Sequence, residues 1–277
     1  MINTNTNLLK EDYFESTYFV NKFQNSQKII NLDTQSLTDI LLKRLNDIFQ
    51  LDRKLDESDV TNLHNLVPRK YLKYDPHYGI SGISNLLYDF DDDFNAVYKS
   101  IIKNQLRDQL DFDFYFQEIP TIRIHTPSPD ANMFYPYFHS DIQLGHPPYE
   151  INIWFPLTRP SNDEGHGFVI CSLEKSMSIY ESYNLDTSQM NANKEVINEL
   201  AKEDAKSVKC LPGEAIMFDS RCLHSAIPLR DHTRISIDVR IMPKKIFHNF
   251  NRVYAGTGRK KIKFIPGEAY SLNSSEI

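Results

Sequence analysis

Apolar positions in the first third of the chain recur at helical spacing. Residues 36–51 place five apolar side chains on one side of a helix, opposite a polar face: Leu37, Ile40, Leu41, Leu45 and Ile48. Residues 92–110 repeat the pattern and open on aspartates, which suit the positive end of a helix dipole. Turn signals in "YDPHYGISG" (74–82) separate the two segments. Residues 1–110 are therefore predicted to be mostly helical.

From about residue 111 the pattern changes to short alternating or β-branched runs, bounded by Pro, Gly, Asn and Asp. We expect antiparallel strands at 121–126, 149–157, 167–173, 207–211, 214–219 and 234–242. A helical segment near 191–206 interrupts this series. The pattern thus predicts a sheet-rich core of the sandwich or barrel kind over 111–245, covered by the helical N-terminal part and followed by a C-terminal extension, 246–277.

Composition narrows the class of protein. The chain has 277 residues, of which 40% are hydrophobic and 25% charged, as in soluble globular proteins. A net charge of −6 argues against a nucleic-acid partner, and no run approaches the roughly 20 apolar residues of a membrane span. The N-terminus lacks the features of a secretory signal, and three widely spaced cysteines suggest reduced thiols. A cytoplasmic protein is expected; its oligomeric state is not indicated.

Candidate metal ligands lie in the predicted core. The stretch "PYFHSDIQLGH" (136–146) contains the H-x-D motif His139–Asp141. On an extended backbone, residues two apart point to the same side, so one strand end is predicted to supply both ligands. His224 follows the strand at 214–219. Two histidines and one carboxylate form the facial triad of non-haem Fe(II) oxygenases. Taken alone, H-x-D is also compatible with a hydrogen-bonded pair that caps a turn.

A candidate carboxylate-binding pair follows ten residues after His224. Arg234 opens the strand "RISIDVRI", and Ser236 shares its face. The planar guanidinium and the hydroxyl suit two-point binding of a distal carboxylate. A salt bridge at the rim of the sheet is the alternative for the arginine alone. The combination of H-x-D, a distant histidine and R-x-S carries more weight than any one motif.

These motifs, spread over about residues 120–243, resemble the Fe(II)/2-oxoglutarate-dependent dioxygenases. The phrases "HSDIQLGHPPYEINIWFPLT" and "LPGEAIMFDSRCLHSAIPLRDHTRISIDVR" resemble the branch of phytanoyl-CoA hydroxylase-like and streptomycin-biosynthesis StrG-like proteins. The resemblance implies a double-stranded β-helix (jelly-roll, cupin-like) core, mainly β with α. It also implies a set of site residues: His139, Asp141 and His224 as Fe(II) ligands, and Arg234 and Ser236 on the C5 carboxylate of 2-oxoglutarate.

The resemblance further implies a reaction class. Fe(II), 2-oxoglutarate and O2 would oxidise a small polar metabolite or biosynthetic intermediate, most simply by hydroxylation, with release of succinate and CO2. Halogenating relatives lack the ligand carboxylate, so Asp141 favours hydroxylation, or a desaturating or ring-forming variant. Substrate identity is not readable, because the regions expected to set specificity, the helical first third and the insert at 174–206, show no recognisable motif.

Other polar side chains are predicted on the same interior face. Asn152 alternates with Trp154 on the strand at 149–157, and it either contacts co-substrate or substrate or is satisfied by backbone. Arg123 and His125 share a face of 121–126, where Arg123 either meets an anionic substrate or forms a structural ion pair.

Two more candidates have weaker signals. Arg240 lies on the Arg234 face by period two and is predicted to contact a carboxylate or the substrate. His146, in the loop after the H-x-D motif, either lines the pocket or is exposed.

Two other functions remain open at this stage. In a cupin-type isomerase or epimerase the metal is a Lewis acid, and neither 2-oxoglutarate nor O2 is required. In a non-catalytic module the metal or 2-oxoglutarate is only bound. The pairing of Arg234 with Ser236 argues against the isomerase, and less strongly against the binding module.

Overall fold

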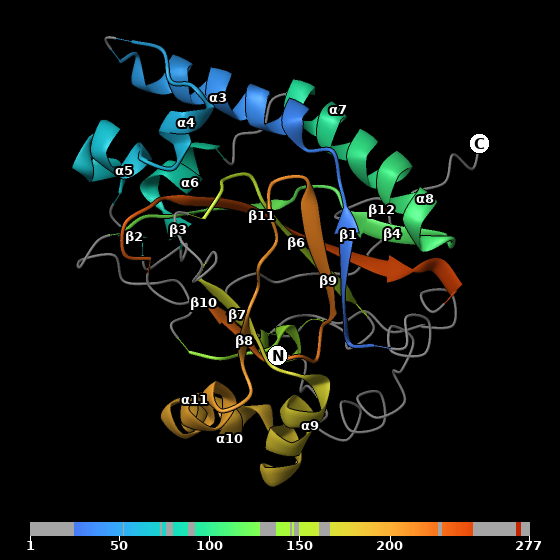
Figure 1. Cartoon of the computed structure of the whole chain (residues 1–277). Coiled ribbons are helices and arrows are strands. Elements are labelled where there is room, and N and C mark those ends of the chain that lie inside the picture. The colour runs from blue at the N-terminus through green and yellow to red at the C-terminus, as the bar shows by residue number, and fades with distance from the viewer. Residues whose placement is uncertain are drawn as a thin grey trace, which may run out of the picture.

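Two antiparallel sheets face each other in this protein (Figure 1). The computed structural model describes residues 25–51, 53–72, 74–75, 80–87, 92–127, 137–144, 146, 150–160, 167–226, 229–245 and 270–272. The main sheet has the order β1 (Gln27–Asn31), β9 (Glu214–Asp219), β6 (Ile151–Pro156), β11 (Arg234–Pro243), β4 (Phe114–Gln117), β12 (Tyr270–Leu272), with β5 (Thr121–His125) also paired to β11. The minor sheet has the order β10 (His224–Ala226), β7 (Phe168–Ile170), β8 (Lys206–Ser207).

Helices cover the outside of both sheets (Figure 1). Over the main sheet lie α3 (Gln35–Phe49), α7 (Asp92–Ser100), the π-helical η2 (Ile101–Leu106) and α8 (Arg107–Leu110). Nearby are α4 (Glu57–Val60), α5 (Leu63–Leu66), η1 (Arg69–Tyr71), α6 (Gly82–Leu87) and the hairpin of β2 (Tyr74–Asp75) and β3 (Ile80–Ser81). Against the minor sheet pack α9 (Leu173–Ser182), α10 (Thr187–Ala192) and α11 (Lys194–Lys202).

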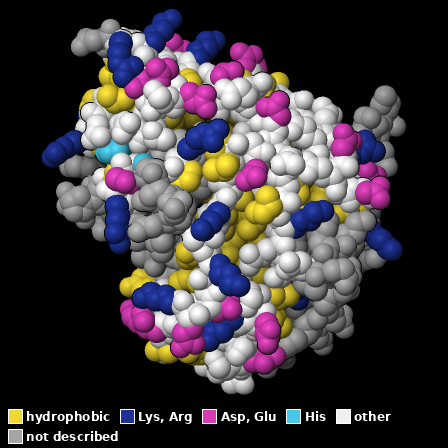
Figure 2. Space-filling model, in the orientation of Figure 1, with side chains coloured by type: hydrophobic (Ala, Val, Ile, Leu, Met, Phe, Trp, Pro, Cys, Tyr) yellow, Lys and Arg dark blue, Asp and Glu magenta, His cyan; other side chains and the backbone are white. Residues whose placement is uncertain are grey.

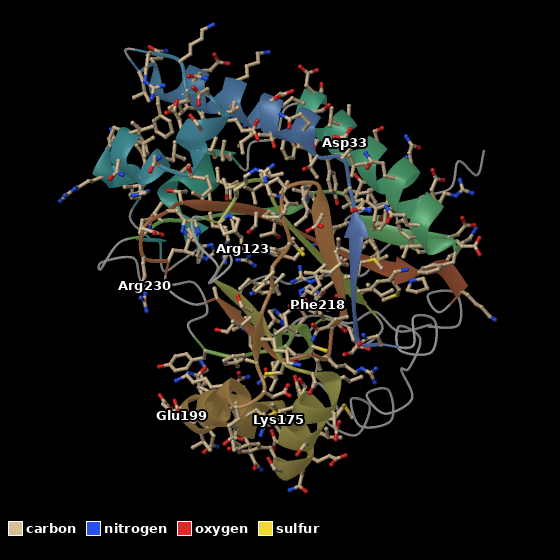
Figure 3. All side chains as sticks on the ribbon, in the orientation of Figure 1. Asp33, Arg123, Lys175, Glu199, Phe218 and Arg230 are labelled. Carbon is tan, nitrogen blue, oxygen red and sulfur yellow. The ribbon has the colours of Figure 1, made fainter. Side chains whose placement is uncertain are left out.

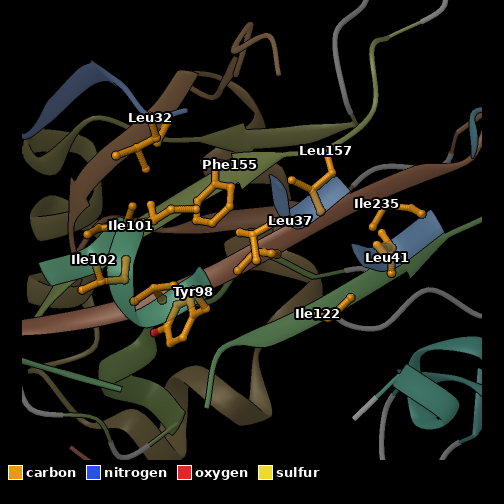
Figure 4. Packing of buried hydrophobic residues seen from close by; sticks show 14 of the residues in the cluster. Leu32, Leu37, Leu41, Tyr98, Ile101, Ile102, Ile122, Phe155, Leu157 and Ile235 are labelled. Atoms are coloured by element: carbon orange, nitrogen blue, oxygen red, sulfur yellow. The ribbon is translucent and has the colours of Figure 1, made fainter. Parts of the chain in front are cut away.

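The side-chain period of two gives β11 an apolar face and a polar face. Ile235, Ile237 and Val239 join the core beneath the helices. Figure 4 shows Ile235 in this core together with Leu37 and Leu41 from α3. The alternate residues of β11 point to the other face, toward the minor sheet: Arg234, Ser236, Asp238 and Arg240. The main sheet therefore carries the helices on one side and a polar surface on the side where the candidate site lies.

The predicted arrangement of antiparallel strands and helices is confirmed. Helices occupy the predicted segments 36–51 and 92–110, and α11 lies within the predicted helical segment 191–206. The strands β1, β2, β3, β4, β10 and β12 were not predicted, because runs of two to five residues seldom show a reliable period. The proposed division at 110 and 245 stays a prediction, but residues on both sides of it contribute strands to the main sheet.

On the face shown in Figure 2, basic and acidic side chains are interspersed among the residues that the structure describes. This mixture agrees with the small net charge of −6. Among the described residues, no helix is both long enough and apolar enough to cross a membrane.

The contact between α3 and the main sheet gives a stability prediction. Leu41 is 1% exposed, and its truncation in Leu41→Ala should lower the free energy of unfolding by about 2–5 kcal/mol, because a cavity remains. Leu211 is 43% exposed, so Leu211→Ala should change the free energy of unfolding by no more than about 0.5 kcal/mol. Urea unfolding measures both, and equal losses would contradict the packing of α3 on the sheet.

Candidate metal centre

The two candidate histidine ligands are joined through their backbones. His139 and His224 form an isolated antiparallel bridge, in which the His139 N–H donates to the His224 carbonyl (3.1 Å) and the His224 N–H donates to the His139 carbonyl (2.8 Å). Directly opposed residues of an antiparallel pair point to the same side. Their imidazole centroids accordingly lie 4.5 Å apart, although the residues are far apart in sequence.

Asp141 reaches the histidines in a way that the sequence did not predict. The expectation of an extended backbone through His139 and Asp141 is wrong, because Asp141 begins the 3-10 helix η3 (Asp141–Leu144). The Gln143 side chain accepts from the Ser140 N–H (2.8 Å), and the Gln143 N–H donates to the Ser140 carbonyl (3.1 Å), so the chain turns at once. The Asp141 carboxylate nevertheless lies close to the imidazoles of His139 and His224.

The three side chains meet at one point. One ligand atom from each of His139, Asp141 and His224 lies within 4.8 Å of the other two, and this is the metal-type cluster found among the described residues. The Nδ1–H of His139 donates to the Tyr137 carbonyl (3.2 Å), and that of His224 to the Cys222 carbonyl (3.0 Å). These bonds place the hydrogen on Nδ1, which leaves the Nε2 lone pairs for a metal.

Burial keeps the donors in the protonation state that a metal needs. It lowers the pKa of His139 to about 3, with a further contribution from His224, and it also lowers the pKa of His224. Burial is the largest single influence on the pKa of Asp141 and would raise it, but the charge and hydrogen bonds of Arg240, together with His146 and His224, outweigh burial and hold that pKa well below its usual range. Two neutral imidazoles and one carboxylate form a donor set that fits a divalent ion such as Fe(II).

Arg240, which was predicted to contact a carboxylate or the substrate, contacts the carboxylate of Asp141. Its Nε donates to Oδ2 (2.7 Å) and its Nη2 to Oδ1 (3.0 Å). Both side chains are buried, with 11% and 1% of their surfaces exposed. The guanidinium therefore holds both oxygens of the candidate ligand.

Glu150 is a buried carboxylate that sequence reasoning missed. His146 donates from Nδ1 to Glu150 Oε2 (2.7 Å), and the Tyr270 hydroxyl donates to Oε1 (2.8 Å). Arg240 Nε lies 3.9 Å from Oε2. His146 is 4% exposed, so the alternative of an exposed loop histidine is wrong. An acidic residue just before an apolar strand commonly faces water, and its burial here depends on Tyr270, which is distant in sequence.

The remaining predicted residues line the inner face of the main sheet. Arg123 forms an ion pair with Asp238 from the neighbouring strand, which is the structural alternative considered for it. Arg123 and Phe218 are seen between the two sheets in Figure 3. Arg234 donates to His125 Nδ1 (2.7 Å), and its guanidinium carbon lies 5.9 Å from the centre of the Trp154 ring.

Electrostatics distinguish Arg234 from its neighbours. Burial lowers the pKa of Arg234 to about 10, so it remains charged at neutral pH. Burial, followed by the charge of Arg234, lowers the pKa of His125, which is therefore a neutral partner. The Ser236 hydroxyl and the Asn152 Oδ1 are buried and make no hydrogen bond among the described residues. Buried polar atoms of this kind need an explanation, and a bound water, ion or polar ligand is one.

Two contacts outside the site support the ligand segments. The Tyr180 hydroxyl, from α9, hydrogen-bonds the Ser140 hydroxyl between the first histidine and the aspartate. In the turn before β10, Asp219 accepts from the backbone N–H (3.0 Å) and the Nε (2.8 Å) of the buried Arg221. Both ligand segments are thus held by neighbours that do not themselves face the metal.

This chain is similar to known proteins in sequence over a short stretch and in fold. No protein-family model matches the chain. The streptomycin biosynthesis protein StrG of Streptomyces griseus is 39% identical over 72 residues, which are 26% of this chain and only 34% of StrG. The carbocyclase SnoK from nogalamycin biosynthesis, a non-haem α-ketoglutarate-dependent enzyme, has a TM-score of 0.50 at 12% identity, covering 83% of each chain. The α-ketoglutarate-dependent epimerase SnoN has a TM-score of 0.49 at 9% identity, covering 96% of this chain and all of SnoN.

The chain shares its fold with SnoK, and the predicted resemblance is confirmed at the level of the fold. The short match to StrG supports the predicted branch. The roles of individual site residues stay predictions that the geometry supports.

The assignment of ligands predicts the effect of removing an imidazole. His139→Ala should abolish binding of Mn(II), used as a stable substitute for Fe(II), because one of three donors is lost. His64 hydrogen-bonds Thr233 away from the cluster, so His64→Ala should bind Mn(II) with wild-type affinity. Anaerobic titration calorimetry measures both. Full metal occupancy in His139→Ala would refute the assignment.

Proposed function

We propose that the protein is an Fe(II)- and 2-oxoglutarate-dependent oxygenase with a jelly-roll core, and that it hydroxylates a small polar molecule. The observation that carries this proposal is the cluster of His139, Asp141 and His224, with both Nδ1 atoms tied to carbonyls. Three donors from one side leave three adjacent positions on the ion, enough for a chelating co-substrate and O2. A bound Fe(II) would supply the O2-dependent oxidation that also yields succinate and CO2.

Among the described residues of the inner face, Arg234 and Ser236 are suited to bind the distal carboxylate of 2-oxoglutarate. Arg240 is engaged by Asp141 and Arg123 by Asp238, whereas Arg234 donates to a neutral imidazole. The Ser236 hydroxyl lies two residues along the same face and has hydrogen-bonding capacity available. We therefore assign the carboxylate to Arg234 and Ser236, in keeping with the pattern in the sequence.

Asn152 and Trp154 occupy the neighbouring strand on the same face. Asn152 stands opposite Arg240 in the register, and its buried Oδ1 is available to accept from the co-substrate or substrate. Trp154 stacks on Phe168, with ring centroids 5.0 Å apart, and closes the apolar end of the space between the sheets. These side chains would exclude water from the reacting centre.

The proposed reaction predicts O2-dependent consumption of 2-oxoglutarate. Purified protein with Fe(II), ascorbate and 2-oxoglutarate should form succinate in air, and His139→Ala should form none. Product analysis by mass should show one added oxygen, whereas loss of two hydrogens would indicate ring closure or desaturation. Turnover of a substrate under anaerobic conditions would instead favour an isomerase, and binding of 2-oxoglutarate without succinate, across a panel of small polar metabolites, would favour a binding module.

The role of Arg234 predicts a separate loss of co-substrate affinity. Arg234→Met should raise the Kd for 2-oxoglutarate by roughly 30-fold or more, equivalent to about 2 kcal/mol. The reason is that the distal carboxylate of 2-oxoglutarate would be buried without its charged partner. Binding of Mn(II) should be retained, since Arg234 is not a ligand.

The exposed Arg230, which lies away from the inter-sheet space in Figure 3, provides a matched control. Arg230→Met should bind 2-oxoglutarate as the wild type does. Calorimetry in the presence of Mn(II) measures the Kd for 2-oxoglutarate in both variants. An unchanged Kd in Arg234→Met would contradict the assignment of the distal carboxylate to Arg234.

A further inference from the structure

The contact between Arg240 and Asp141 has a directional consequence for metal binding. Two N–H groups of one guanidinium donate to the two different oxygens of the carboxylate, at 2.7 and 3.0 Å. This fork occupies the side of the carboxylate on which both oxygens are presented together. A metal that chelated both oxygens would need the same side.

We propose that Arg240 is a positioning residue that makes Asp141 a single-oxygen metal ligand. This inference rests on the proposed function, because it concerns the same metal site. With Arg240 in place, an ion can reach only the outer lone pair of one Asp141 oxygen. The chain then supplies three donor atoms, and three positions stay available for the co-substrate and O2. A chelating aspartate would take one of these positions.

Arg240 is itself held in place from several directions. Its backbone N–H donates to Gln117 Oε1 (3.2 Å), and its Nε lies 3.9 Å from Glu150 Oε2. Glu150 is fixed in turn by His146 and Tyr270. The His146 N–H also donates to the Asp141 carbonyl (3.0 Å). His146 therefore links the segment that carries Asp141 to Glu150. A guanidinium restrained in this way can impose its geometry on the carboxylate.

Two substitutions separate geometry from charge. Arg240→Lys keeps the positive charge but replaces the planar fork with a point charge, and Arg240→Met removes both. If the fork positions Asp141, Arg240→Lys should bind Mn(II) about 10- to 100-fold more weakly than the wild type, the usual cost of losing a partner of a metal ligand. Arg53→Lys, which alters a guanidinium fork on the carboxylate of Asp59, outside the candidate site, should keep wild-type Mn(II) affinity.

A count of the water molecules bound to Mn(II), by spin-echo or relaxation measurements, gives a second readout. The wild type should hold about three, and Arg240→Met fewer, because Asp141 becomes free to chelate. Wild-type Mn(II) affinity in Arg240→Lys would show that charge suffices, and an unchanged water count in Arg240→Met would show that the fork does not limit Asp141. Either result overturns the inference.

Stability measurements keep a structural role distinct from positioning. If the variants unfold at lower urea concentrations while the folded protein binds Mn(II) normally, Arg240 serves only the fold and the inference fails. Arg240→Lys retains the buried charge and is the variant to use should Arg240→Met not fold. Absence of Mn(II) binding in the wild type would instead refute the proposed function itself, so the two failures are distinguishable.

Discussion

Reciprocal backbone hydrogen bonds between His139 and His224 are the constraint on which the candidate site depends. They bring two distant segments into register and turn both imidazoles to the same side. A slip of one residue would send one ring to the opposite face, because side chains alternate along extended chain. The flanking contacts, Tyr180 on Ser140 and Arg221 on Asp219, stabilise the two segments on either side of this pair. The geometry of the metal donors is thus set by main-chain pairing rather than by the flexible side chains alone.

The inner face of the main sheet departs from the apolar pattern of an ordinary sandwich. It holds the fully buried Arg234 and the largely buried Arg123 and Arg240, together with carboxylates that compensate the last two. Buried charges carry a large desolvation cost, and well-packed apolar residues in these places would often be as stable or more so. Such a face is therefore better explained by the proposed binding of a divalent ion and an anionic co-substrate than by the needs of folding. The helix-covered face of the same strands, with Ile235 and Ile237, supplies the packing that offsets this cost.

Much of this arrangement could be predicted from the sequence because it depends on local periodicity and residue type. Period two placed Arg234, Ser236 and Arg240 on one face, and the donor types of His139, Asp141 and His224 indicated a metal. The partner of each charge could not be predicted, since cross-strand pairing depends on register between distant segments. The same holds for Glu150, whose burial requires Tyr270, and for β1 and β12, whose pairing partners lie far along the chain. Asp141 was predicted on a strand because side-chain control of the turn by Gln143 leaves little trace in the hydrophobic pattern.

The position of Tyr270 in the sequence bears on the order in which the centre is assembled. During synthesis, a nascent chain that extends just past His224 already holds all three metal donors, but neither Arg240 nor Tyr270 has been made. Tyr270 lies 120 residues after its partner Glu150, so this hydrogen bond closes a very large loop. Long-range closures of this kind form late and slowly. An ion captured by the nascent chain would therefore meet a looser aspartate than an ion that arrives once β12 has docked.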